Sequence, residues 1–157
     1  MWRHSLLIAL LLVIIVPLSL SAPHVAETNT RSDRIVAAVR AVLDAQVDAW
    51  NRGDIEAYMA GYWRSDKTIF ISGDSVTRGW ETVAARYKKG YDSREKMGTL
   101  TFSELEITPI GSDAAIALGR WHLQRAKDEP HGRFTLTFRK TEQGWRIVLD
   151  HTSSASG

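Results

Sequence analysis

His151 is the residue whose type and position best suit acid–base chemistry. It continues an alternating row of apolar residues near the C-terminus, where the next apolar side chain would be expected. Two such rows lie close together: Phe134, Leu136 and Phe138, and then Trp145, Ile147 and Leu149. A histidine titrates near neutral pH, so a ring in line with a buried face predicts a general acid or base, or a ligand contact. A structural role remains open, in which the ring bonds a backbone carbonyl or a tyrosine hydroxyl.

The two rows predict antiparallel strands closed by the polar turn 141–144. This pairing sets Phe134 opposite His151 and puts Asp150 on the other face of the sheet. Neighbouring residues of a strand point to opposite faces, so Asp150 and His151 are not expected to form a dyad. A loop at 127–130 closes the preceding hairpin and sets Trp121 opposite Leu136. A slip of one residue in either hairpin would exchange the faces.

The outer face of this sheet is predicted to carry a polar cluster of Arg120, His122 and Asp150. Such residues suit either an interface with a few buried charged hydrogen bonds or a solvent-exposed network. We expect the interface to join two copies of the chain as a homodimer.

The elements that position these residues are helices first and strands afterwards, which indicates the α+β class. Apolar residues at three- and four-residue steps predict a helix from Ser32 that Asn51-Arg52-Gly53 ends. Asp54 caps a short second helix, and a third follows Gly79. The expected strands cover 68–72, 98–110, 114–124 and the two C-terminal rows, with a turn at 73–75. The expected organisation is a linker over 22–31, one domain over 32–153 and a disordered tail over 154–157.

Residues 1–21 have the order of a secretory signal peptide. Arg3 gives the start a positive charge, residues 6–16 are unbroken apolar, and small residues follow Pro17. The apolar run is shorter than the roughly 20 residues of a spanning helix. We therefore expect export, to the periplasm or outside the cell, with no membrane attachment after cleavage. Cleavage would lower the formal charge from +2 to +1, since it removes Arg3 and no acid.

Several classes of site have no support in the sequence. The absence of cysteine excludes disulfides and thiolate chemistry. The five histidines show no metal-ligand spacing, and no phosphate-binding glycine loop or nucleophile motif is present. No basic stripe suits a nucleic acid. We expect no metal and no cofactor.

Six short motifs in this order resemble the nuclear transport factor 2-like superfamily, and most closely its bacterial SnoaL-like group. They are Trp50-Asn51-Arg52-Gly53-Asp54, Tyr58-Met59-Ala60-Gly61-Tyr62-Trp63, Thr77-Arg78-Gly79-Trp80, Gly119-Arg120-Trp121, Gly144-Trp145-Arg146-Ile147-Val148 and Asp150-His151-Thr152-Ser153. The resemblance covers 32–153. It implies three helices packed on a curved antiparallel sheet that together enclose a conical pocket.

The resemblance places a set of mostly aromatic side chains in that pocket. The residues expected there are Trp50, Tyr62, Phe70, Trp80, Tyr87, Trp121, Phe134 and His151. Such walls predict that the protein, which we expect to be exported, binds a small apolar or aromatic molecule. Two alternatives stay open: a lyase or isomerase that uses His151 on an enolisable or dehydratable substrate, and a domain that only associates with another protein.

Steroid isomerisation is disfavoured within this superfamily. The ketosteroid isomerases it includes need a carboxylate base near the end of the strand before the third helix. Residues 70–72 of this chain are Phe-Ile-Ser and carry no acid.

Overall fold

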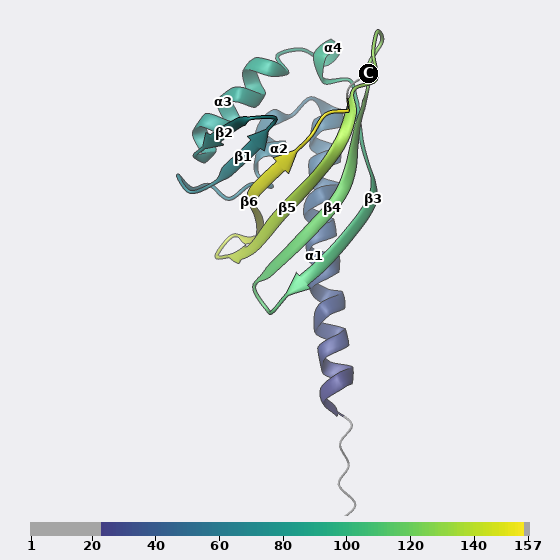
Figure 1. Ribbon diagram of the computed structural model, residues 1–157, viewed down its shortest axis with the longest axis vertical. Coiled ribbons are helices and arrows are strands. Elements are labelled where there is room, and N and C mark those ends of the chain that lie inside the picture. Colours follow the sequence, from purple (N-terminus) through teal and green to yellow (C-terminus); the bar gives the residue numbers. More distant parts are fainter. Residues whose placement is uncertain (1–22, 156–157) are drawn as a thin grey trace, which may run out of the picture.

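The computed structural model describes residues 23–155, which form four helices and six strands in the α+β class (Figure 1). The elements are α1 (Pro23–Arg52), α2 (Ile55–Met59), β1 (Ile69–Ser72), β2 (Ser75–Arg78), α3 (Trp80–Gly90), α4 (Arg94–Met97), β3 (Thr99–Ile110), β4 (Ala114–Gln124), β5 (His131–Thr141) and β6 (Gly144–Thr152). The predicted signal peptide lies outside the described residues. Strand β2 and helix α4 were not predicted from the sequence.

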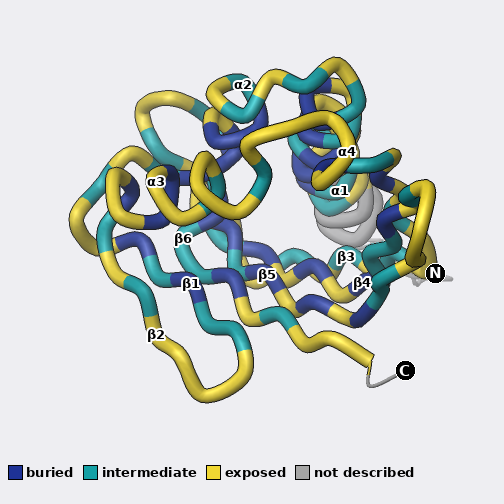
Figure 2. Tube along the Cα trace, turned by 90° about the horizontal axis from the view of Figure 1, so that it is seen from above, coloured by how far each residue is buried: buried dark blue, intermediate teal, exposed yellow. Residues whose placement is uncertain are grey.

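The six strands form one open, curved sheet in the order β2-β1-β6-β5-β4-β3. All four helices lie on one side of it, and the described residues leave the other face uncovered (Figure 2). The expectation of a wholly antiparallel sheet is wrong at one pairing, because β1 runs parallel to β6. These strands lie far apart in the sequence, so no hairpin pattern announces their pairing.

Helix α1 packs across the sheet and supplies much of the core. Its buried side chains recur at three- and four-residue steps, as an amphipathic helix requires: Ile35, Val39, Leu43, Gln46 and Trp50. The helix begins at Pro23, so it covers most of the segment predicted as a linker. Proline is well tolerated in a first helical turn, because its missing N–H has no partner there anyway.

The predicted end of the first helix and the predicted cap of the second are confirmed, although α2 ends at Met59 and not near Tyr62. Helix α1 stops at Arg52, and Gly53 follows with a φ of +83° that suits glycine. Asp54 then caps α2, since its side chain accepts a hydrogen bond from the Ala57 N–H at 2.9 Å.

A β-bulge in β6 decides which residues of that strand face the helices. Phe138 pairs with Ile147, but the next pair is Thr137 with Leu149, so Val148 is an extra residue. Beyond the bulge Phe134 lies opposite Thr152, one residue away from the predicted partner His151. The two faces are therefore exchanged over the last residues of β6.

The hairpin of β4 and β5 also differs from its predicted register. Trp121 lies opposite Gly132, and Gly119 lies opposite Phe134. The shift is an even number of residues, so the predicted faces of these two strands are kept.

The structure describes part of the C-terminal tail that was predicted to be disordered. Ala155 of the predicted disordered tail donates its N–H to the His131 carbonyl at 2.9 Å, while residues 156–157 lie outside the described part. Between residues 23 and 155, no helix has the length and apolar character needed to cross a membrane.

Candidate functional site

A cavity of about 380 Å³ lies between the helices and the inner face of the sheet. Six of the eight predicted pocket residues line it: Trp50, Tyr62, Phe70, Tyr87, Trp121 and Phe134. This volume falls in the usual range of small-molecule sites.

His151 does not line the cavity, which corrects the sequence prediction. Its side chain is exposed on β6, where the residue pairs with Thr135 on one side and Ile71 on the other. The Val148 bulge is the physical reason, since one extra residue turns the following side chains to the opposite face.

Asp150 takes the inward position instead. It is 5% exposed and lines the cavity, so its predicted place on the outer interface is wrong. Its Oδ2 accepts a hydrogen bond from the Tyr62 hydroxyl at 2.6 Å. Its Oδ1 is buried and has no hydrogen-bond partner among the described residues.

The environment of Asp150 favours its neutral form. Burial raises the pKa of Asp150 from 3.8 to about 7, although the hydrogen bond from Tyr62 acts in the opposite direction. A carboxyl group with such a pKa is partly protonated at neutral pH. It can therefore either donate or accept a proton within an apolar site.

All four tyrosines of the chain line the cavity: Tyr58, Tyr62, Tyr87 and Tyr91. The hydroxyls of Tyr62 and Tyr87 lie 3.2 Å apart, which links Tyr87 to Asp150 through Tyr62. Burial raises the pKa of Tyr58, Tyr62 and Tyr87 well above the ordinary value, with the charge of Asp150 acting in the same direction. These hydroxyls stay protonated at physiological pH and can donate hydrogen bonds.

Edge-to-face contacts hold the aromatic wall together. The Trp50 ring lies 5.0 Å from Tyr58 and 4.6 Å from Tyr91, measured between ring centroids. The Trp50 indole N–H donates to the Met97 carbonyl at 3.1 Å, and the Trp121 N–H donates to the Ser153 carbonyl at 2.9 Å. Since each indole N–H is bound to backbone, the two rings are held in place as walls of the cavity.

Several cavity residues were not assigned to the pocket from the sequence, among them Gln46, Tyr58, Arg86, Tyr91, Arg125 and Asp150. One signal could have found two of them. Tyr58 and Tyr62 are four residues apart, as are Tyr87 and Tyr91, and this spacing brings side chains together on one side of a helical segment. Arg86 and Arg125 give no comparable pattern.

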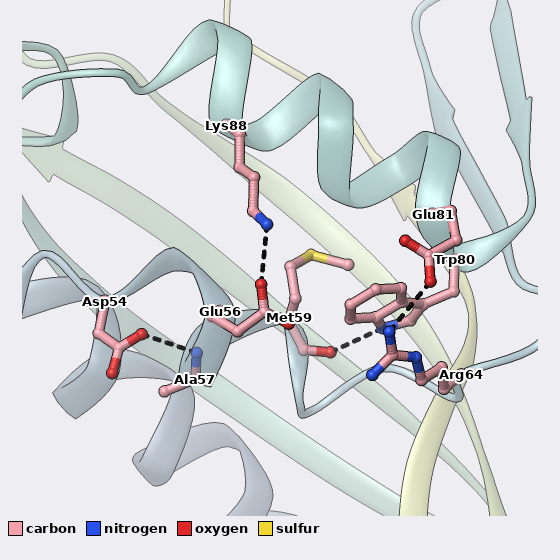
Figure 3. A network of polar contacts seen from close by, with 8 residues as sticks. All are labelled: Asp54, Glu56, Ala57, Met59, Arg64, Trp80, Glu81 and Lys88. Atoms are coloured by element: carbon pink, nitrogen blue, oxygen red, sulfur yellow. Dashed lines mark hydrogen bonds and ion pairs between the residues drawn. The ribbon is translucent and has the colours of Figure 1, made fainter.

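Trp80 does not line the cavity, although it was predicted there. Its indole N–H donates to the Met59 carbonyl at 3.0 Å, and the Arg64 guanidinium lies 4.4 Å from the ring centroid (Figure 3). Trp80 and Tyr87 share a face of α3 but lie two turns apart, about 10 Å along the axis. Tyr87 therefore reaches the cavity while Trp80 packs beside α2.

Ion pairs at the surface lie close to Trp80. Arg64 pairs with Glu81 at 3.1 Å, and Lys88 of α3 pairs with Glu56 of α2 at 2.8 Å (Figure 3). These pairs are more than half exposed, so they add little stability individually.

The two remaining predicted interface residues lie on the uncovered face of the sheet. Arg120 and His122 alternate along β4 with the cavity residues Trp121 and Leu123. His122 contacts Glu129 at 3.4 Å. Exposed apolar side chains of the same strand, Ile116 and Leu118, lie on that face too. Across residues 23–155, the side chains of His, Asp and Glu form no group of three placed to hold a metal ion.

Comparisons with known proteins give a consistent family. The model of the SnoaL-like domain matches residues 39–156. A nuclear transport factor 2-like protein of unknown function from Shewanella oneidensis is 41% identical, with 75% of this chain and 98% of that chain covered and a TM-score of 0.72. None of the curated proteins compared with the chain matches it.

More distant structures share the fold. A nuclear transport factor 2-like superfamily protein from Salmonella enterica has 23% identity and a TM-score of 0.61, with 83% of this chain and 94% of that chain covered. A ketosteroid isomerase-like protein from Erwinia carotovora has 21% identity and a TM-score of 0.62, with 77% and 96% covered. With the family model spanning most of its length, the chain belongs to the SnoaL-like domain family within the nuclear transport factor 2-like superfamily.

Proposed function

We propose that this domain binds a small, largely apolar, ring-containing molecule in the aromatic cavity, with a polar group of that molecule beside Asp150. The observation that carries the proposal is the buried Oδ1 of Asp150, which has no partner among the described residues of a cavity walled mainly by aromatic and aliphatic side chains. A buried polar atom without a partner costs free energy, and a bound molecule would supply the missing hydrogen bond.

The aromatic walls suit such an occupant. Rings meet rings favourably in edge-to-face or offset contacts, and the cavity offers Trp50, Tyr91 and Phe134 for this purpose. The cavity of about 380 Å³ is not filled by the Trp50 and Trp121 rings that line it, which counts against a domain that only associates with another protein.

Native mass spectrometry of the protein purified from its own host tests the proposal. We expect a bound small molecule that Ser72→Trp displaces, because Ser72 lines the cavity and is partly exposed. Ser75→Trp is the matched control: Ser75 is the cross-strand partner of Ser72 but does not line the cavity. The proposal fails if no mass is bound and the neutral probe 2-naphthamide does not bind the purified protein either.

An enzymatic role is the second candidate, favoured by the pKa of about 7 and the contact with Tyr62. In this role the Asp150 carboxylate removes a proton from a carbon next to a carbonyl. Tyrosine hydroxyls donate to the enolate oxygen, and the Asp150 carboxylic acid returns the proton. Asp150 takes the acid–base role that the sequence suggested for His151.

Deuterium exchange separates this role from binding alone. The bicyclic ketone 2-tetralone in deuterated buffer should exchange its acidic hydrogens faster with the wild-type protein than with Asp150→Asn. Equal rates for the two proteins would leave a binding role only.

We also propose that the chain is exported and forms a homodimer through the uncovered sheet face. The n-region charge and short apolar stretch of residues 1–21 support export. N-terminal sequencing of protein from the native host should begin near Ala22, and an intact Met1 in the cytoplasmic fraction would contradict export.

A further inference from the structure

Two buried side-chain atoms among the described residues have no hydrogen-bond partner, and both belong to residues that line the cavity. They are Oδ1 of Asp150 and Nε of Arg125. One is an acceptor or, when the acid is protonated, a donor; the other is always a cationic donor. Unpaired buried polar groups are rare in native proteins, so two around one cavity indicate an occupant with two matching polar groups.

Other atoms of the Arg125 side chain have close neighbours, whereas its Nε has no hydrogen-bond partner among the described residues. The residue directly follows β4, and its Cγ lies against the backbone of Gly98 after α4. Its terminal nitrogen Nη1 lies 3.5 Å from Asp128. The side chain is 23% exposed, so it belongs to the boundary between the cavity and solvent.

Arg86 of α3 adds a second cation to this boundary. It is exposed on α3 and lines the cavity, with its guanidinium 5.1 Å from the Phe70 ring centroid. Among the described residues it forms no ion pair, so its charge is not neutralised by a neighbouring acid.

Arg125 and Arg86 both lie close enough to Tyr91 for their charges to act on its hydroxyl. Burial raises the pKa of its hydroxyl, while the charges of Arg125 and Arg86 both lower it. The more exposed cavity residues, Arg86, Gly90 and Ser154, mark the mouth, whereas Gln46, Tyr62 and Asp150 are buried at the floor. The mouth is thus cationic and the floor carries a carboxyl group.

We propose that the molecule bound in this cavity is an amphipathic carboxylate, with its carboxylate at Arg125 and Arg86, its apolar ring body against the aromatic walls and a second polar group at Asp150. The inference rests on the proposed binding function and names its ligand class. Arginine suits this role because its donors match the geometry of a carboxylate and its charge is permanent.

A pair of probes of nearly the same shape, one anionic and one neutral, tests the ligand class. Titration calorimetry at about pH 6 compares 2-naphthoate, which is ionised there, with the neutral 2-naphthamide. We expect 2-naphthoate to bind about tenfold more tightly, the effect of one charge-assisted hydrogen bond. Arg125→Gln should abolish this preference, and Arg86→Gln should reduce it.

Two further variants keep the test interpretable. Arg125→Lys keeps the charge but lacks the Nε donor, so it should retain part of the preference. Arg78→Gln removes the same charge from the exposed edge strand β2, outside the cavity, and should leave the preference intact. Thermal unfolding of each variant shows whether it is folded.

The outcomes separate this inference from the function on which it rests. Equal affinity for the two probes, or a preference for 2-naphthoate that survives Arg125→Gln, would overturn the carboxylate class while the binding function stands. If neither probe binds the folded wild-type protein and no small molecule is bound to protein from its own host, the proposed function fails together with the inference.

Discussion

The Tyr62 hydroxyl donates a hydrogen bond of 2.6 Å to Oδ2 of Asp150, between two residues 88 positions apart in the chain. Tyr62 follows α2 and also forms a parallel bridge with Ile147 of β6, while Asp150 follows the bulge in the same strand. The contact therefore joins the helical layer to the sheet at the floor of the cavity. It couples the protonation of Asp150 to the stability of the fold.

Asp150→Asn should make the protein more stable at high pH. The folded-state pKa of Asp150 is raised to about 7 from 3.8, so the folded state binds its proton more tightly than the unfolded chain. Any stability from this group is fully present below pH 3.8 and is lost as the pH rises through 7. The lost stability is at most about 4 kcal/mol, from roughly three pH units at 1.36 kcal/mol each.

Urea unfolding of wild type and Asp150→Asn at about pH 5 and pH 8 measures this difference. The free energy of unfolding of the variant, relative to that of the wild type, should rise by about 1–3 kcal/mol from pH 5 to pH 8. The other titrating groups are common to both proteins and cancel in the comparison. A difference independent of pH would contradict the raised pKa.

Tyr62→Phe should raise the pKa of Asp150 further. The hydroxyl stabilises the ionised carboxylate, and its removal leaves both carboxyl oxygens without a donor. We expect a loss of about 1–3 kcal/mol at pH 8, where Asp150 is ionised, and a smaller loss at pH 5. Carbon-13 NMR of the Asp150 carboxyl follows the titration directly, and an unchanged midpoint would refute the role of Tyr62.

His151→Ala should have almost no effect. The side chain is exposed and points away from the cavity, so its removal should change the free energy of unfolding by less than about 0.5 kcal/mol. Probe binding should also stay at the wild-type level. Calorimetric melting and the 2-naphthamide titration check both points, and a variant that lost binding would show that the ring reaches the ligand.

The uncovered sheet face should form the homodimer. Leu118 is 37% exposed in the middle of β4, beside the polar residues Arg120 and His122. Leu118→Glu would introduce a charge at this apolar position, and the charge would be unpaired in an interface. Light scattering should give twice the monomer mass for the wild type and the monomer mass for the variant.

Val76→Glu is the matched control for this test, because Val76 is also exposed but lies on the edge strand β2. The control should remain a dimer. A wild-type protein that is monomeric at high concentration would remove the proposed interface.

Local patterns were sufficient to predict most of the fold. The three- and four-residue spacing of α1, the cap at Asp54, and the extents of β3 and β4 agree with the sequence expectations. So does the inward face of β4 and β5, which carries Trp121 and Phe134 into the cavity. These features depend on residues close together in the chain, where the side-chain period alone separates buried from exposed positions.

Tertiary structure decided which titratable residue faces the cavity. Ile147, Val148 and Leu149 are three consecutive apolar residues. An alternating apolar row can therefore continue from Ile147 or from Val148, and the sequence does not reveal the extra residue. The bulge at Val148 and the parallel pairing of β6 with β1 together set Asp150 inward and His151 outward. A single unpaired residue reverses every later side chain in a strand, and its position depends on how the whole sheet curves against the helices.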